Sequence, residues 1–150
     1  MKVLIIVCAL SVSLVMVQGA CPAGFTYWAD NGYCYRYISS PAVFPAADSY
    51  CASLALGCKL ASIHSLPEEG FVNKIAQTTG NYWIGLNDVL EENSWVWTDG
   101  SAAVWKHWDC SQPNGGTASN CVAGNYGSSD RWRDTTCEAS LPYVCKVKAM

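Results

Sequence analysis

The sequence predicts a single α+β domain held together by disulfides, and three observations lead to this prediction. A chain of 150 residues is a usual length for one domain. After a short hairpin, helical periodicity comes first and strand-like segments cluster later, an order that argues against a parallel βαβ sheet. Nine cysteines in a chain with only 14% charged residues are typical of small extracellular domains.

Residues 1–19 have the features of a secretory signal peptide. Lys2 supplies the positive charge, Val3 to Val17 form a mostly apolar stretch, and Val17-Gln18-Gly19 is a small-residue cleavage pattern. The alternative is a membrane anchor, but the stretch is short for a span and lacks a stop-transfer flank. We therefore expect a secreted domain over residues 20–150, without a membrane anchor and with eight cysteines once Cys8 is removed.

Charge and motif content exclude several functions. The formal net charge of −3 and the pI of about 5.2 argue against nucleic acid as a partner. The two histidines, His64 and His107, stand in no recognisable catalytic motif, and there is no phosphate loop, HExxH or nucleophile elbow. The spacing of the cysteines does not fit a zinc site. We do not expect an enzyme.

The first half of the chain predicts a hairpin and a helix. Aromatic-rich strands over residues 25–28 and 33–38 flank Asn31-Gly32, a strong hairpin-turn signal. Pro45 opens a helix with an apolar stripe at Ala47, Cys51 and Leu54, and Gly57 can end it.

A short strand over residues 59–63 and a second helix follow. Ser65 and Glu68 form a capping box at the start of this helix, and Gly80 is expected to end it. Further strands are predicted over residues 82–86, 95–98, 121–126 and 142–147, so the two ends of the chain are expected side by side. Residues 99–120 show little periodicity, and an irregular stretch of this length is usually functional.

Several motifs together resemble the C-type lectin domain family. They are Tyr82-Trp83-Ile84-Gly85-Leu86, Trp95-Val96-Trp97-Thr98-Asp99-Gly100, Gln112-Pro113-Asn114, Cys121-Val122, Trp132-Arg133-Asp134, and Cys137 with Cys145. The resemblance implies the C-type lectin fold: two helices, small antiparallel sheets and a long ligand-binding loop.

The resemblance also implies a disulfide pattern. By analogy the pairs are Cys21–Cys34, Cys51–Cys145 and Cys121–Cys137. Elimination leaves Cys58 with Cys110, a pair outside the common family pattern. The alternative is that one or both of these cysteines bridge to a second chain, which would make a homo-oligomer.

In lectins of this family a calcium ion in the long loop coordinates sugar hydroxyls, and the resemblance implies Gln112, Asn114 and Asp134 as its ligands here. Arg133 stands where the family has asparagine. It offers no acceptor, and two like charges about 4 Å apart repel by about 4 kcal/mol at an effective dielectric constant of 20. We therefore expect calcium binding to be weak or absent.

Three further residues are candidates for this chemistry. Trp108 lies beside the loop, where an exposed ring can stack on a sugar, so it is a candidate for ligand binding. Asp88 and Glu92 match part of an auxiliary calcium site, in which Gly115 and Asn120 replace two expected aspartates. The alternative for Asp88 and Glu92 is that they are solvated turn residues.

The resemblance implies a secreted carbohydrate-recognition protein that binds glycans or glycoproteins through residues 112–134, in innate defence, with weak or absent calcium dependence. The alternative is a calcium-independent domain that binds a protein, mineral or ice surface. The segment from Trp108 to Ser111 resembles a cysteine-bearing loop of fish type II antifreeze proteins, which keeps ice among the options.

Overall fold

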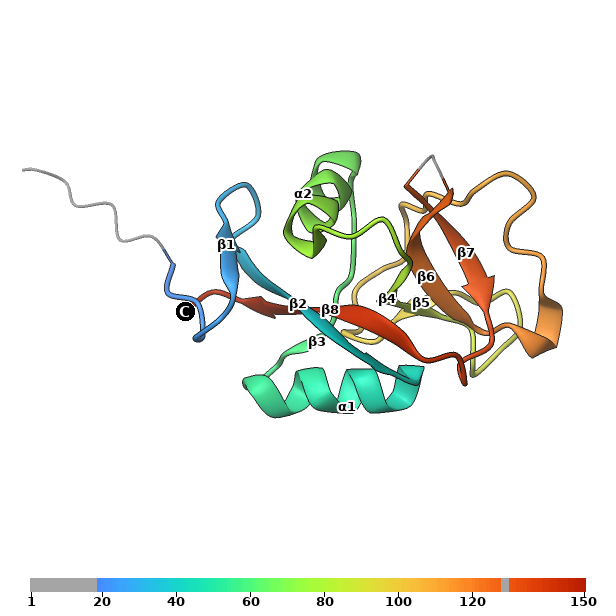
Figure 1. Ribbon diagram of the computed structural model, residues 1–150, viewed down its shortest axis with the longest axis horizontal. Helices are drawn as coiled ribbons and strands as arrows, with labels where there is room; N and C mark the ends of the chain where they lie inside the picture. The colour runs from blue at the N-terminus through green and yellow to red at the C-terminus, as the bar shows by residue number, and fades with distance from the viewer. Residues whose placement is uncertain (1–18, 128–129) are drawn as a thin grey trace, which may run out of the picture.

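The computed structural model describes residues 19–127 and 130–150 (Figure 1). The predicted signal peptide, with Cys8, lies outside the described residues except for Gly19. The helices are α1 (Phe44–Leu54) and α2 (Leu66–Ala76), and the long loop contains one 3-10 turn, η1 (Gly116–Ala118). The strands are β1 (Thr26–Trp28), β2 (Tyr33–Ala42), β3 (Lys59–Leu60), β4 (Tyr82–Asn87), β5 (Val96–Trp97), β6 (Cys121–Tyr126), β7 (Arg131–Thr135) and β8 (Leu141–Lys148).

The strands form one sheet in the order β1-β2-β8-β4-β6-β7, with β3 paired to β8 and β5 to β4. Antiparallel pairing of β2 with β8 brings the two ends of the described chain together, as predicted. The Ala20 amide donates to the Met150 carbonyl at 3.1 Å. Figure 1 shows α1 and α2 on opposite sides of the β2–β8 ribbon, and β6 and β7 at the far end of the sheet.

Both predicted helices form, but each ends earlier than expected. Pro45 occupies the first turn of α1, which ends at Leu54, before Gly57. The Ser65 side chain caps α2 by accepting from the Glu68 amide at 3.3 Å, as the capping box predicts. Gln77, not Gly80, closes α2, in the left-handed conformation with φ of 48°.

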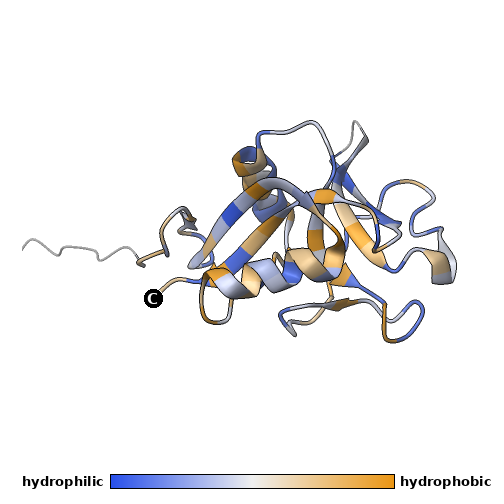
Figure 2. Cartoon of the chain, turned by 60° about the horizontal axis from the view of Figure 1, so that its bottom comes forward, coloured by the Kyte–Doolittle hydropathy of each residue, from blue (hydrophilic) through white to orange (hydrophobic). Residues whose placement is uncertain are grey.

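The core consists of two apolar clusters, formed by the central strands and the helices that pack on them, and Figure 2 shows hydrophobic segments along these strands. One cluster surrounds the Cys51–Cys145 disulfide and includes Trp83. The other contains Trp97 and Trp132 and lies next to the start of the long loop. Burial of large aromatic side chains on β4, β5 and β7 thus builds the platform from which the loop projects.

The three disulfides implied by the resemblance are formed: Cys21–Cys34, Cys51–Cys145 and Cys121–Cys137. The expected Cys58–Cys110 pair is wrong, because both cysteines are free, Cys58 buried and Cys110 exposed. Cys58 precedes β3, which pairs with β8, whereas the neighbour of Cys110 hydrogen-bonds to β7. β4 and β6 lie between β8 and β7, and three strand spacings of about 4.8 Å exceed the reach of a disulfide.

Candidate functional site

The long loop runs along the edge strand β7 before it turns outward. The Trp132 amide donates to the His107 carbonyl at 2.9 Å, and the Asp109 amide donates to the Trp132 carbonyl at 2.8 Å. Trp108 thereby forms a parallel bridge with Trp132. Residues 107–109 are therefore held alongside β7 by an isolated bridge, shortly before the Gln112-Pro113-Asn114 motif.

A buried carboxylate from α2 ties this segment to the core. Glu69, 3% exposed, accepts from the Trp132 indole N–H at 2.5 Å and pairs with His107 Nδ1 at 2.6 Å. Burial raises the pKa of Glu69 above its ordinary value, although hydrogen bonding to His107 opposes the shift. Helix α2 thus positions the loop through one side chain.

At the tip of the loop, the structure brings Gln112, Asn114 and Asp134 together. Asp134 Oδ1 accepts from the Asn114 amide at 3.0 Å, and Oδ2 accepts from the Gly115 amide at 2.8 Å. Gln112 Oε1 accepts from the Asp134 amide at 3.3 Å, and the Gln112–Pro113 peptide is cis. These hydrogen bonds occupy the carboxylate that the resemblance implies as a calcium ligand, and they hold the tip against β7.

Arg133 lies on the opposite face of β7 from Asp134. Side chains alternate along a strand, and the burial of β7 alternates accordingly. The Arg133 guanidinium carbon lies 4.7 Å from the centre of the Tyr126 ring, a cation–π contact. The Arg133 side chain therefore does not point toward the place where a cation beside Asp134 would lie, and the expected direct repulsion does not apply. The three candidate ligands Gln112, Asn114 and Asp134 nevertheless carry little negative charge, since Asp134 is the one carboxylate among them.

Trp108 packs instead of projecting as a free platform. Its ring is half-buried, with its centre 4.8 Å from that of Trp95 and 6.2 Å from that of Trp132, both edge-to-face. Only part of the Trp108 ring is therefore open to a ligand, and the rest packs against the second core cluster.

Asp88 and Glu92, the candidate auxiliary calcium ligands, have different surroundings. Asp88 is 2% exposed, so it is not a solvated turn residue, whereas Glu92 is exposed. Asp88 Oδ2 accepts from the Asn93 amide at 2.8 Å, and the Asp88 amide donates to the Asn120 carbonyl at 3.1 Å. Asp88 Oδ1 and Asn120 Oδ1 are both buried without a hydrogen-bond partner in the described part of the chain.

The two unpartnered oxygens bear on whether the residues around Asp88 could hold a calcium ion. Buried acceptors without a partner are costly, and a hard cation with oxygen ligands would satisfy them. However, residues 19–127 and 130–150 contain no group of three or more His, Cys, Asp or Glu side chains that can hold a metal ion. The oxygen atoms near Asp88 are thus of the kind that a hard cation prefers, but they supply little negative charge to balance the charge of the cation.

A buried polar network away from the loop is not foreseen by the sequence reasoning. Lys146, 5% exposed, pairs with Glu68, 2% exposed, at 2.7 Å, and donates to the Ser62 carbonyl at 2.9 Å. The capping box singles out Glu68 in the sequence, but it predicts a role only at the start of the helix. Charged residues are rarely buried, so sequence patterning places them at the surface.

Comparison with known proteins identifies relatives over nearly the whole described chain. The Lectin C-type domain profile matches residues 40–147. An alpha-N-acetylgalactosamine-specific lectin of Patiria pectinifera is 37% identical over 127 residues, covering 78% of this chain and 75% of that protein. Lithostathine of Rattus norvegicus is 34% identical over 134 residues, covering 86% of this chain and 79% of that protein.

Solved structures of related proteins have the same fold as this chain. A calcium-independent type II antifreeze protein superposes with a TM-score of 0.80 and is 29% identical, covering 88% of this chain and 97% of that chain. In the described part of this chain, no helix is long and apolar enough to cross a membrane.

Proposed function

The chain belongs to the C-type lectin domain family, and we propose that it is a secreted carbohydrate-recognition protein that binds glycans through the loop at Gln112–Asp134 with little or no dependence on calcium. The observation that carries the proposal is the tip of the loop, where Gln112, Asn114 and Asp134 are held together by three hydrogen bonds. A role in innate defence stays a prediction from the resemblance.

The exposed polar groups of the loop tip support glycan binding. Asn114 is exposed and Gln112 is partly exposed, so their side chains can exchange hydrogen bonds with sugar hydroxyls. Asp134 fixes the backbone at Asn114 through its carboxylate and holds the side-chain oxygen of Gln112 through its amide, which leaves the Gln112 amide group to donate. Because the loop tip is already ordered by the protein's own contacts, a ligand need not order it on binding.

Calcium has a minor place in this proposal. The family's loop ion would be held by Gln112, Asn114 and Asp134, and it would supply direct coordination of sugar hydroxyls. Both Asp134 oxygens already accept amide hydrogens, and one carboxylate compensates a divalent charge poorly. The Asp88 and Asn120 oxygens are the better-disposed acceptors, and an ion there would stabilise the base of the loop without reaching a sugar.

A glycan array tests the proposal directly, with the purified protein applied in calcium and again in EDTA. We expect the same glycans to be bound in both conditions. Asp134→Asn should abolish binding, since an amide cannot accept two backbone amide hydrogens with both of its ends. Glu138→Gln is the matched control and should bind as the wild type does, because its exposed carboxylate forms no hydrogen bond with Gln112, Asn114 or Asp134 in the described part of the chain.

The outcome against the proposal is equally defined. Absence of glycan binding in both conditions, by a protein that melts cooperatively, would end it. Binding that EDTA abolishes would show that calcium completes the loop site, and would overturn the calcium-independent part.

Ice binding is a second candidate because the chain superposes on a calcium-independent type II antifreeze protein with a TM-score of 0.80. Ice recrystallisation inhibition by the folded protein, compared with the heat-denatured protein, tests this candidate. Equal activity of the two samples would discard it.

A further inference from the structure

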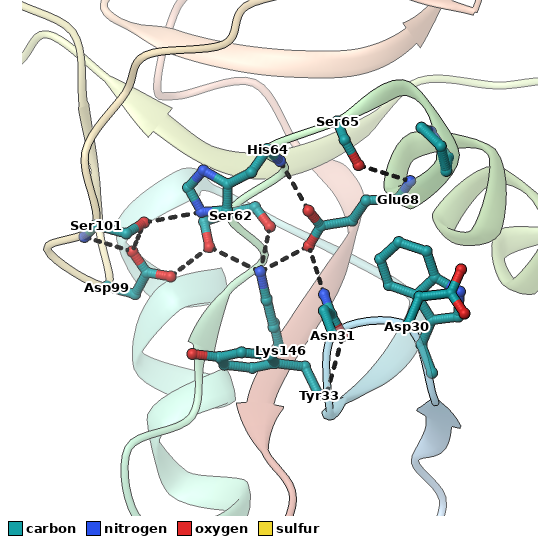
Figure 3. Close-up of a pocket in the computed structure, with 12 residues that line it drawn as sticks. Asp30, Asn31, Tyr33, Ser62, His64, Ser65, Glu68, Asp99, Ser101 and Lys146 are labelled. Carbon is teal, nitrogen blue, oxygen red and sulfur yellow. Dashed lines mark hydrogen bonds and ion pairs between the residues drawn. The ribbon is translucent and has the colours of Figure 1, made fainter.

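A pocket of about 410 Å³ lies away from the loop tip, and the proposed glycan function does not use it. It is bounded by the β1–β2 hairpin, the segment that leads into α2, the turn after β5 and the middle of β8 (Figure 3). Its volume lies within the range of small-ligand sites. The lining residues that matter for its chemistry are Trp28, Asp30, Ser62, His64, Asp99 and Lys146.

The buried side of the pocket is electrically neutral and its strong donors are already engaged. All three hydrogens of the Lys146 ammonium have partners: the Ser62 carbonyl, the Ser62 hydroxyl and Glu68 Oε1, at 2.9, 3.1 and 2.7 Å. The Asn31 amide donates to Tyr35 Oη at 2.7 Å and to Glu68 at 3.3 Å. An anion entering the pocket would therefore find no free cationic donor.

The mouth of the pocket has the opposite character. Asp30 and Asp99 are exposed, and Figure 3 shows them on opposite sides of it. Within the described residues, the Asp30 side chain forms no hydrogen bond or ion pair. Asp99 accepts from the Ser101 amide at 2.9 Å and from the Ser62 and Ser101 hydroxyls.

The other titratable group at the mouth does not offset these charges. Burial and the nearby Lys146 lower the pKa of His64, so its ring is neutral at pH 7. Its Nε2 lies 3.1 Å from the Ser101 hydroxyl. Burial alone would raise the pKa of Asp99, but hydrogen bonds from Ser101 and Ser62 outweigh it and hold the pKa below its ordinary value. The Asp99 carboxylate thus stays charged, across the mouth from the exposed side chain of Asp30.

An aromatic wall completes the site. The Trp28 ring lines the pocket, and its orientation is fixed by stacking on Phe71, with ring centres 5.5 Å apart and 17° between the planes. A tryptophan face attracts cations, and an ammonium group supplies three donors to acceptors with spare capacity.

We propose that the pocket bounded by Trp28, Asp30 and Asp99 binds a primary ammonium group of a small ligand. The lysine side chain of a peptide and an amino sugar both carry this group. The pocket is independent of the proposed glycan loop, because no residue of the loop tip lines it.

The test is NMR titration of the ¹⁵N-labelled protein, observing the Trp28 indole N–H. The ammonium probes are Gly-Lys-Gly and glucosamine, each matched with a neutral probe, Gly-norleucine-Gly and glucose. We expect at least one ammonium probe to shift the Trp28 signal saturably while its neutral match does not, and the responding probe identifies the source. Raising the salt concentration should weaken binding, because both carboxylates are exposed.

Variants locate the interaction. Asp30→Asn should weaken binding about threefold, and the Asp30→Asn, Asp99→Asn double variant about tenfold, the range expected for exposed ion pairs. Glu138→Gln and Asp134→Asn should bind the probes as the wild type does, the latter even though it loses glycans. Equal response to the neutral probes, no saturable response, or equal weakening by Glu138→Gln would overturn the proposal.

Discussion

Asp134 shows how one side chain determines the shape of a functional loop. Its carboxylate receives two consecutive backbone amides, from Asn114 and Gly115, and its own amide donates to Gln112. Hydrogen bonds to a carboxylate are stronger than those between neutral groups, and the Asp134 side chain is shielded from water because the residue is only 7% exposed. The loop tip is therefore anchored to β7 before any ligand arrives.

Gly115 is the residue at which this anchoring is most sensitive to volume. A Cβ at this position would lie 2.1 Å from Ser119 Cβ and 3.1 Å from Asp134 Oδ2. We expect Gly115→Ala to lower the free energy of unfolding by about 1–3 kcal/mol, the usual cost of overpacking, and to weaken glycan binding.

Chemical denaturation and the glycan array measure both effects of Gly115→Ala. Gly80→Ala is the control, because the nearest atom to its Cβ would be Thr78 Oγ1 at 3.5 Å. Adding Ser119→Gly to Gly115→Ala should restore stability. Failure of this rescue would contradict the steric explanation.

The two free cysteines should differ sharply in reactivity. Cys58 is 1% exposed, and burial raises the pKa of its thiol to about 11, whereas Cys110 is exposed. Since the thiolate is the reactive form, we expect iodoacetamide at pH 8 to label Cys110 and spare Cys58 in the folded protein.

Peptide mass spectrometry, with and without denaturant, measures this difference in labelling. Unfolding should make both cysteines reactive. Resistance of Cys110 in the native sample, reversed by a reductant, would reveal the bridge to a second chain that the sequence left open. Equal native labelling of both residues would contradict the buried position of Cys58.

At the scale of elements, the first turn of α2 connects three parts of the molecule. Glu68 and Glu69 are consecutive and both buried, but they serve different partners. Glu68 joins the hairpin and β8 through Tyr35 and Lys146, and Glu69 joins the long loop through His107. Successive helical residues point about 100° apart, so two neighbours reach two separate networks.

The Glu69 contact predicts a pH dependence of stability. The pKa of Glu69 is raised above 4.5, chiefly by burial, so the folded protein retains a proton that the unfolded chain releases. This contribution is full below pH 4.5 and is lost as pH rises through the folded-state pKa. The charge of Asp130 strengthens the shift, and His107 and Trp132 oppose it.

The prediction concerns the difference between the wild type and Glu69→Gln. The free energy of unfolding of the wild type, relative to the variant, should decrease as pH rises above 4.5. Denaturant titrations at several pH values measure this difference, with Glu138→Gln as the control. A difference that increases with pH would contradict the direction of the shift.

Local signals explain which elements the sequence predicts correctly. The Asn31-Gly32 turn, Pro45 and the Ser65 cap act on neighbouring residues, and the hairpin and both helix starts are found where these signals place them. β7 was not predicted as a strand. The alternation of buried and partly exposed residues over Arg131–Thr135 is short, and the segment becomes a strand by pairing with β6.

Within the candidate site, the structure brings together Gln112, Asn114 and Asp134, which the resemblance had grouped. Two other features needed three-dimensional information. The orientation of Arg133 depends on which face of β7 meets Tyr126, and this is set by strand register. The separation of Cys58 from Cys110 depends on the order of strands in the sheet. Neither the strand register nor the order of strands can be read from the composition or the local pattern of the sequence.

At the scale of the whole molecule, the fold is closed by links between distant parts of the chain. β2 and β8 pair along most of their length, and the Cys51–Cys145 disulfide joins α1 to β8 across a sequence separation of 94. The Cys21–Cys34 disulfide spans only 13 residues within the N-terminal hairpin region. The two crosslinks therefore constrain very different lengths of the unfolded chain.

This difference predicts an order of stabilities. On the chain-entropy model a loop of about 100 residues contributes about 4.7 kcal/mol and one of about 15 residues about 3 kcal/mol. Replacing Cys51 and Cys145 by alanine should therefore lower the free energy of unfolding by more than replacing Cys21 and Cys34. Guanidinium titrations of the two double variants measure the gap, expected to be about 1–2 kcal/mol. An equal loss in both would show that local packing around each bridge, and not closure of the chain, determines its contribution.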